Sequence, residues 1–212
     1  MRVVLVGDIH SKVTELLAIA AKHAPTPVIQ LGDFGFGFTV VPELPDNLMY
    51  IRGNHDDPAL AANRPNYLGD YGTLYPAPFT LPFDKKVFYI SGAYSIDYAL
   101  RVPNVSWWEQ EELSYPELAQ AINLYERERP DIVISHEAPS AAIETILNLF
   151  KMQRHNKLGC AFSRTAHALQ QMLDIHKPEM WVFGHHHLPG DFNLFGTRFV
   201  CLPELTTMEV SI

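Results

Sequence analysis

The sequence predicts an α/β fold in a single domain, residues 1–212, on three observations. Five short apolar runs have the length and composition of buried strands, and a polar cluster directly follows each of them. Segments with helical periodicity lie between several of these runs. A chain of 212 residues with 47% hydrophobic and 19% charged residues is long enough for one sizeable core and short for two. No repeat, low-complexity tract or linker divides it.

Strands and helices are expected along the whole chain. The five apolar runs are Val3–Val6, Val28–Leu31, Leu48–Ile51, Ile132–Ile134 and Trp181–Phe183. Further strands are expected at Lys86–Ser91, Phe192–Phe195, Thr197–Leu202 and Met208–Ile212, with a tight turn at Gly196. Helices are expected at Pro116–Arg129, Ala141–Phe150 and Arg164–Ile175. A first helix, capped by Ser11, carries Leu16, Leu17, Ala20 and Ala21 on one face and ends before Pro25.

Glycine, proline and basic residues mark the loops. Residues Phe34–Phe38 alternate Phe with Gly, and we expect this loop to lie over the functional crevice. The Pro-, Tyr- and Gly-rich segment Pro58–Pro82 is predicted to form loops with short extended pieces. Lys151–Lys157 is a basic loop between two predicted helices.

Each of the five apolar strands runs into a cluster of Asp, Asn or His residues. The clusters are Gly7-Asp8-Ile9-His10, Gly32-Asp33, Gly53-Asn54-His55-Asp56, Ser135-His136-Glu137 and Gly184-His185-His186-His187. In an open α/β fold, residues beyond the carboxyl ends of the strands converge on one crevice. Side chains two apart on an extended chain share a face, which pairs Asp8 with His10 and His185 with His187. The sequence therefore predicts that these clusters meet.

The chemistry of these side chains is that of a metal site, and two metals are favoured. The candidate ligands are Asp8, His10, Asp33, Asn54, His136, His185 and His187. Asp33 supplies a carboxylate that can bridge two cations. Oxygen and nitrogen ligands without thiolate suit Mn²⁺, Fe, Zn²⁺ or Co²⁺ rather than Ca²⁺. The HExxH signature of metalloproteases is absent, and the HxHxDH signature fails because positions 189 and 190 are Pro189 and Gly190.

In their order and spacing, the five clusters resemble the motifs of the calcineurin-like metallophosphoesterase superfamily. Its blocks GD-x-H, GD, GNH-D, H and GH-x-H are all present between residues 7 and 187. The resemblance implies two facing mixed β-sheets flanked by helices, a four-layer sandwich with a dinuclear centre at the strand ends. It also implies that two divalent transition-metal ions are bound. We expect Mn²⁺, with Fe, Zn or Co as alternatives.

The resemblance also implies a role for each matching position. Asp8, His10 and His187 would hold the first metal, Asn54, His136 and His185 the second, and Asp33 would bridge both. His55 matches the superfamily's catalytic histidine, which faces the substrate without binding metal. Two ions about 3.5–4 Å apart clamp a phosphate and activate a bridging water as hydroxide. The hydroxide attacks phosphorus in line, and His55 protonates or stabilises the leaving oxygen.

Two departures disfavour the protein Ser/Thr phosphatase branch of the superfamily. That branch has an Asp and an Arg shortly after the second GD block, whereas this chain continues as Phe34-Gly35-Phe36-Gly37. It also has Glu after GNH, where this chain has Asp56. We therefore expect a phosphodiester substrate in preference to a phosphomonoester. Asp56 and Asp57 are candidates to orient His55.

Composition restricts the partners. A net charge of −8 argues against binding extended duplex nucleic acid but is compatible with a small phosphoester or nucleotide held by metals. No apolar run approaches the ~20 residues of a membrane span, and no secretory signal precedes the first strand. Cys160 and Cys201 form no CxxC motif. We expect a cytoplasmic protein with no membrane partner, in an oligomeric state that the sequence does not specify.

Two alternatives to a hydrolase of small phosphoesters stay open. One is a catalytically silent scaffold on the same fold, as in the retromer subunit that resembles this family. The other is a nuclease that acts on short nucleic-acid ends. Arg101, Arg154 and Lys157 are possible phosphate contacts, although solvated basic side chains are the simpler interpretation. His186 is expected to point away from the ligands beside it.

Overall fold

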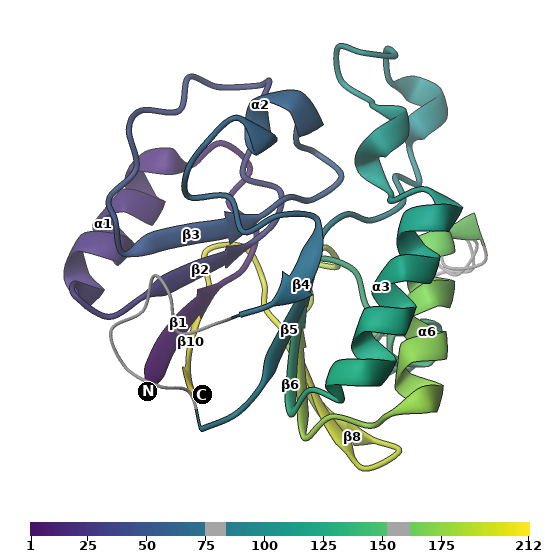
Figure 1. The fold of residues 1–212 in the computed structure, drawn as a ribbon. Helices are drawn as coiled ribbons and strands as arrows, with labels where there is room; N and C mark the ends of the chain where they lie inside the picture. Colours follow the sequence, from purple (N-terminus) through teal and green to yellow (C-terminus); the bar gives the residue numbers. More distant parts are fainter. Residues whose placement is uncertain (75–83, 152–161) are drawn as a thin grey trace.

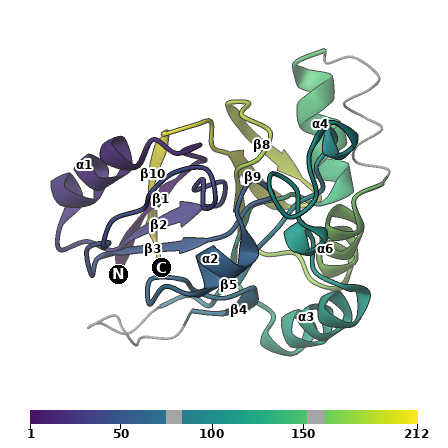
Figure 2. The same cartoon turned by 90° about the horizontal axis from the view of Figure 1, so that it is seen from above.

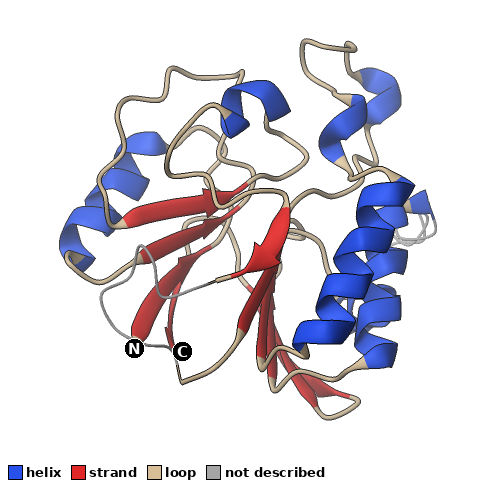
Figure 3. Cartoon of the chain, in the orientation of Figure 1, coloured by secondary structure: helices blue, strands red, loops and turns tan. Residues whose placement is uncertain are grey.

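Two facing β-sheets form the centre of the computed structural model, which describes residues 1–74, 84–151 and 162–212 (Figures 1 and 3). The four-stranded sheet has the order β10-β1-β2-β3, and the six-stranded sheet the order β4-β5-β6-β7-β9-β8. Their bounds are β1 Arg2–Val6, β2 Val28–Leu31, β3 Leu48–Ile51, β4 Tyr71–Thr73, β5 Val87–Ile90, β6 Ile132–Ser135, β7 Met180–Phe183, β8 Gly190–Leu194, β9 Thr197–Cys201 and β10 Thr207–Ser211. The inner strands are parallel, whereas β10, β4 and β8 pair antiparallel at or near the edges.

Helices cover the outer faces of both sheets. Helix α1 packs outside the four-stranded sheet, and α3, α4 and α6 lie outside the six-stranded sheet (Figure 2). The bounds are α1 Val13–His23, α2 Pro58–Ala62, α3 Tyr115–Glu128, α4 Ser140–Leu149 and α6 Arg164–Ile175, with 3₁₀ turns η1 Tyr98–Leu100 and η2 Glu109–Glu111. Among the described residues, no helix combines the length and hydrophobicity needed to cross a bilayer.

Three apolar clusters hold these layers together. Between the sheets, Leu5 and Ile29 of one sheet pack in the same cluster as Ile134 and Val182 of the other. A second cluster joins the six-stranded sheet to α3, α4 and α6, and a third joins the four-stranded sheet to α1. Burial of apolar surface stabilises each junction. The predicted α/β architecture of two mixed sheets flanked by helices is therefore confirmed.

Most of the predicted element bounds agree with the structure to within two residues. The β8–β9 hairpin turns at Phe195 and Gly196, which both have positive φ, as a two-residue turn of matching twist requires. The predicted cap of the first helix was wrong. Ser11 has φ +70° and donates its N–H to the carbonyl of Phe34 3.0 Å away, so it belongs to the loop after β1, and α1 begins at Val13.

The aromatic loop and the Pro-rich segment also differ from expectation. Phe34 and Phe36 do not cover the crevice, because both are buried in the cluster beneath α1; only Phe38 reaches the surface. The segment predicted as loops contains α2 and β4, and its residues 75–83 lie outside the described part of the chain. Of the basic loop, Arg154 and Lys157 also lie outside it, as does Cys160.

Candidate metal centre

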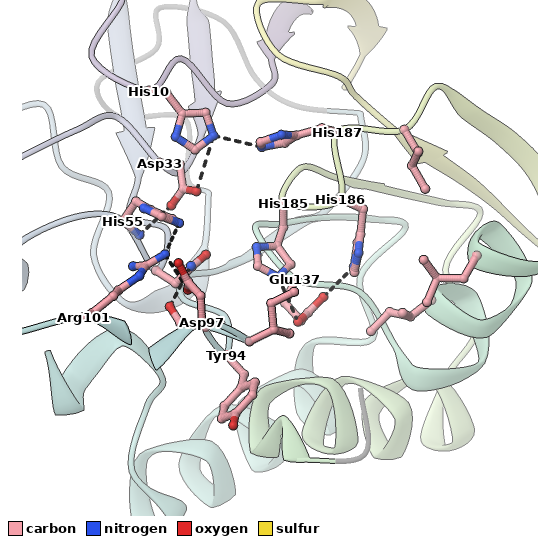
Figure 4. Close-up of a pocket in the computed structure, with 16 residues that line it drawn as sticks. His10, Asp33, His55, Tyr94, Asp97, Arg101, Glu137, His185, His186 and His187 are labelled. Atoms are coloured by element: carbon pink, nitrogen blue, oxygen red, sulfur yellow. Dashed lines mark hydrogen bonds and ion pairs between the residues drawn. The ribbon is translucent and has the colours of Figure 1, made fainter. Parts of the chain in front are cut away.

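The candidate site lies where strands of both sheets end. Strands β1, β2 and β3 of one sheet and β6 and β7 of the other each run into one of the Asp/His clusters. Figure 4 shows side chains from both sheets facing one another across a single pocket. All seven predicted ligands and His55 are brought to this edge. The convergence results from parallel strands whose carboxyl ends meet at one side of the fold.

One group of side chains at this edge has the spacing of a cation site. One ligand atom from each of Asp8, His10, Asp33 and His187 lies within 4.8 Å of the others. His187 Nε2 lies 2.8 Å from Asp8 Oδ2 and 2.9 Å from His10 Nε2. His10 Nε2 lies 3.8 Å from Asp33 Oδ2. Two carboxylates and two imidazoles thus surround one position.

A second group shares Asp33 with the first. One ligand atom from each of Asp33, His136 and His185 also lies within 4.8 Å of the others. His136 Nε2 is 3.3 Å from Asp33 Oδ1 and 3.0 Å from Asn54 Oδ1. His136 Nδ1 lies 2.7 Å from the Leu31 carbonyl, which orients the ring so that Nε2 faces the site. The two oxygens of Asp33 therefore face different groups.

The glycines of the motifs provide the space that these side chains occupy. A Cβ atom on Gly53 would collide with the Asp33 carboxylate and the His136 ring, and one on Gly184 would collide with Asp8. Four candidate ligands also have left-handed backbone, with φ of +41° at His10, +53° at Asp33, +62° at His185 and +53° at His187. Such strain costs about 1–3 kcal/mol per residue and is concentrated at functional sites.

Burial and opposite charges shift the pKa values of the site. Burial raises the pKa of Asp33, but His136, aided by His55 and His10, outweighs burial and holds that pKa far below its usual value. Burial lowers the pKa of His136, but Asp33 and Asp8 reverse this and raise it to about 10. Burial lowers the pKa of His185 to about 4, leaving it a neutral imidazole. In the absence of a cation, a proton on His136 thus compensates the buried carboxylates.

The donors fit two divalent transition-metal ions. Two carboxylates, one amide oxygen and four imidazoles are oxygen and nitrogen donors of the kind that such ions prefer. Binding cations would replace the proton that His136 holds, which is the usual coupling of metal binding to proton release. The sharing of Asp33 by two groups is the arrangement that a pair of neighbouring ions requires.

Asp56 supports the site from behind and does not orient His55. Its buried carboxylate accepts backbone N–H groups from Phe34 at 3.1 Å, Gly35 at 2.7 Å, Phe36 at 3.0 Å and Gly53 at 2.8 Å. It therefore joins the loop after β2 to the loop after β3.

The hypothesis that Asp57 orients His55 is also wrong. Asp57 Oδ1 accepts from the N–H groups of Ala59 and Leu60 at 2.9 and 3.1 Å, so Asp57 caps α2. This capping occupies the carboxylate at the start of a helix, where its charge is stabilised.

Arg101 lies in the site, although from the sequence we favoured a solvated side chain at this position. Its side chain is only 8% exposed, contacts the His55 ring through Nη2 and pairs with Asp97 Oδ1 at 2.8 Å (Figure 4). Burial lowers the pKa of His55, and Arg101 and His10 lower it further, against Asp33, which raises it. No sequence motif marks Arg101, because it lies in an irregular loop far from His55 along the chain.

His186 does not point away from its neighbour His185, contrary to expectation: the two rings lie with centroids 4.9 Å apart, face the same carboxylate and line the same pocket. The Nε2 atom of His186 lies 2.9 Å from Glu137 Oε1, and Glu137 Oε2 lies 3.7 Å from His185 Nε2. The buried Glu137 carboxylate therefore faces two neighbouring imidazoles. The coulombic effect of His185 and His186 outweighs burial and lowers the pKa of Glu137 to about 2.

The pocket beside these groups is a cavity of about 320 Å³. One wall is formed by His10, Asp33, His55, His185 and His187, and Arg101 lies at its side. The apolar part of the lining comes from Tyr94, Ile96, Ile143, Leu147 and Leu188. A cavity of this size suits a small molecule rather than a folded macromolecule.

Fold and site together define a metal-dependent phosphoester hydrolase. The chain belongs to the calcineurin-like phosphoesterase family, whose model matches residues 1–189. The sequence-level resemblance is thereby confirmed. No curated protein gives a significant match over this chain.

Two solved structures align over most of the chain, with low sequence identity and TM-scores below 0.5. One is a conserved protein of Streptococcus pneumoniae TIGR4 described as a predicted phosphoesterase, with 10% identity, a TM-score of 0.43 and coverage of 100% of this chain and 84% of that one. Another is phosphopantetheinyl hydrolase from Mycobacterium tuberculosis, with 13% identity, a TM-score of 0.47 and coverage of 95% and 89%.

Proposed function

We propose that this protein hydrolyses small phosphoesters, diesters in preference to monoesters, at a centre that holds two divalent metal ions. Asp8, His10 and His187 bind one ion, Asn54, His136 and His185 bind the other, and Asp33 binds both. The observation that carries the proposal is that the two oxygens of Asp33 face two separate ligand groups. When bound, such ions polarise the phosphate and supply a nucleophilic hydroxide at neutral pH.

The protein's own side chains position the substrate and handle the proton. His55 lies beside the first ligand group, with its ring centroid 5.4 Å from that of His10. It donates a proton to the leaving oxygen, a role in which a positioned histidine contributes about 10²–10⁴-fold to rate. Arg101 binds a phosphate oxygen. A phosphate that takes up the guanidinium frees His55 Nε2, which accepts from Arg101 in the unliganded pocket. The freed Nε2 then takes up a proton from water, and this is the proton that His55 passes to the leaving oxygen.

The charge of the pocket supports a diester. Among the described residues, Arg101 is the single Lys or Arg that lines the cavity. A diester carries one negative charge and a monoester close to two at neutral pH, so one guanidinium matches the diester better. The cavity volume and the net charge of −8 support a small substrate over extended duplex nucleic acid. We propose Mn²⁺ as the ion to test first.

A comparison of two chromogenic substrates tests this proposal. Purified protein with Mn²⁺ is expected to hydrolyse bis-p-nitrophenyl phosphate faster than p-nitrophenyl phosphate. Asp8→Ala and His136→Ala are each expected to abolish turnover, and His55→Ala to lower kcat by about 10²–10⁴-fold. Unchanged rates in Asp8→Ala and His136→Ala would refute the proposed centre. Absence of turnover with both ions bound would favour a silent scaffold, and cleavage of short oligonucleotides alone would favour a nuclease.

A further inference from the structure

Behind the second ligand group lies a buried carboxylate that the proposed reaction does not use. Glu111 is 3% exposed, Ser95 is 1% exposed and Asn54 is 2% exposed. Ser95 contacts both Glu111 and Asn54. Glu111 sits in the 3₁₀ turn η2, far from Asn54 in the sequence. Its closeness to the site therefore results from the fold and not from any sequence motif.

Three hydrogen bonds connect Glu111 to Asn54 through Ser95. The backbone N–H of Ser95 donates to Glu111 Oε1 at 2.9 Å, and the Ser95 hydroxyl donates to Glu111 Oε2 at 2.6 Å. The side-chain amide of Asn54 donates through Nδ2 to the Ser95 hydroxyl oxygen at 2.9 Å. Every polar atom in this chain of contacts is occupied.

Ser95 has a single hydroxyl proton, and this determines which group donates and which accepts in each of these hydrogen bonds. An ionised carboxylate only accepts, so the single hydroxyl proton of Ser95 goes to Glu111. The Ser95 oxygen is then left with lone pairs and can only accept from Asn54. Asn54 must turn its NH₂ towards Ser95 and its carbonyl oxygen towards the ligand group. Only the carbonyl oxygen of an amide side chain binds a divalent cation.

The backbone around Glu111 is fixed as well. The Glu111 carbonyl accepts the N–H of Ala93 at 3.2 Å, and the buried Arg52 guanidinium donates to the carbonyl of Gln110 at 2.6 Å. A Cβ atom on Gly92 would collide with the Glu111 carbonyl oxygen. Glu111 is therefore held by the strand-end loops that also carry the site.

We propose that Glu111, acting through Ser95, is a positioning residue that fixes the Asn54 amide with its oxygen towards the second metal position. The inference rests on the proposed function, since it concerns how one of the proposed ligands is oriented. Ser95 contacts the proposed ligand directly and Glu111 fixes Ser95; hydrogen-bond partners that orient a metal ligand typically contribute 10- to 100-fold to metal affinity.

The Glu111→Gln variant keeps the shape of the side chain but replaces one acceptor oxygen with an NH₂ donor. One end of the new amide is a donor, so the Ser95 hydroxyl proton is no longer committed to position 111. Ser95 can then donate towards Asn54, which allows the Asn54 amide to invert and present NH₂ to the metal position. Ser95→Ala removes the same connection at its middle.

Glu112 provides a matched control beside Glu111. It is 5% exposed and, like Glu111, accepts from a serine hydroxyl and a backbone N–H, here Ser163 at 3.1 Å and Thr165 at 2.8 Å. These partners begin α6 and do not lead to Asn54. Glu112→Gln therefore reproduces the loss of a buried carboxylate without touching the proposed connection.

The experiment combines Mn²⁺ titration by calorimetry with NMR of the Asn54 side-chain amide in chelator-treated protein. We expect Glu111→Gln and Ser95→Ala to weaken one of two Mn²⁺ equivalents by about 10- to 100-fold. They should also shift the Asn54 Nδ2 signals before metal is added. Glu112→Gln should change neither the Mn²⁺ affinity nor the Asn54 signals, although it should lower Tm by an amount comparable to that of Glu111→Gln.

The outcomes separate this inference from the proposed function. If the wild type binds two equivalents and Glu111→Gln binds both equally well, the positioning role is overturned and the metal centre stands. If the wild type binds fewer than two equivalents, the proposed centre fails. The Asn54 signals in metal-free protein then decide the positioning role alone: unchanged signals in Glu111→Gln overturn it, and shifted signals support it.

Discussion

The Arg101 guanidinium contacts the Nε2 atom of His55. Because arginine only donates hydrogen bonds, Nε2 accepts, and the proton of the neutral ring lies on Nδ1. Asp97 Oδ1 orients the guanidinium from the other side at 2.8 Å. The pair therefore places a fixed positive charge and a titratable imidazole together at the wall of the pocket.

Removal of this charge should weaken substrate turnover without loss of metal. Charge-assisted hydrogen bonds contribute about 1.5–3 kcal/mol, so Arg101→Met should lower kcat/KM for bis-p-nitrophenyl phosphate by roughly 10- to 100-fold. The bound metal content should stay unchanged. Arg198→Met is the control, because Arg198 is surface-exposed, paired with Asp191 and outside the pocket. Equal rates in the two variants would mean that Arg101 does not contact the phosphate.

Asp33 and His10 should differ in how much metal their loss removes. Asp33 faces both ligand groups, whereas His10 belongs to one. We therefore expect Asp33→Ala to lose both Mn²⁺ equivalents after dialysis and His10→Ala to lose one, as measured by elemental analysis. Asp191→Ala, which removes a carboxylate outside the site, should keep both. Retention of one tight equivalent by Asp33→Ala would show that the two positions do not share this residue.

Asp56 should be a major contributor to stability. Its carboxylate accepts four backbone N–H groups, and Asn at this position leaves some of them buried without an acceptor. We expect Asp56→Asn to lower the free energy of unfolding by about 3 kcal/mol in urea titrations of the metal-free protein. Asp57→Asn should be nearly neutral, because asparagine is as good a helix cap as aspartate. Comparable losses in both variants would contradict this account.

The buried Glu111 carboxyl should give stability a measurable pH dependence. Burial raises its pKa from 4.5 to about 6, against hydrogen bonds from Ser95 that lower it. The folded chain thus holds the proton more tightly than the unfolded chain. The contribution of Glu111 is fully present below pH 4.5 and is lost as the pH rises through about 6.

Glu111→Gln cannot titrate, so it isolates this effect. The free energy of unfolding of the wild type minus that of Glu111→Gln should fall by about 2 kcal/mol between pH 4.5 and pH 7, measured without metal. A difference that stays constant or increases over this range would show that Glu111 does not carry a raised pKa.

The site residues that belong to sequence motifs could be predicted from the sequence, whereas those on irregular loops could not. Asp8, Asp33 and His136 each come directly after an apolar strand, and parallel strands deliver the residues beyond their carboxyl ends to one edge. Arg101 and Glu111 lie on irregular loops, where position depends on tertiary contacts with no periodic signal. Asp56 and Asp57 are adjacent in sequence, and only the structure shows that Asp56 binds the backbone of two loops whereas Asp57 caps a helix.

The aromatic loop after β2 illustrates the same limit within the fold. From the alternation of Phe and Gly we expected this loop to lie over the crevice, but Asp56 fixes its backbone and Phe34 and Phe36 are buried in the core. The sheets were predictable because apolar runs have few alternatives to burial. The direction of a loop side chain depends instead on which distant acceptor holds its backbone.

Stepwise addition of Mn²⁺ to chelator-treated protein, with hydrolysis of bis-p-nitrophenyl phosphate measured at each step, shows whether turnover needs both ions. We expect activity to rise until two equivalents are bound and one equivalent to leave the protein largely inactive. Full activity at one bound equivalent, or no hydrolysis with two bound, would contradict the proposed two-metal centre.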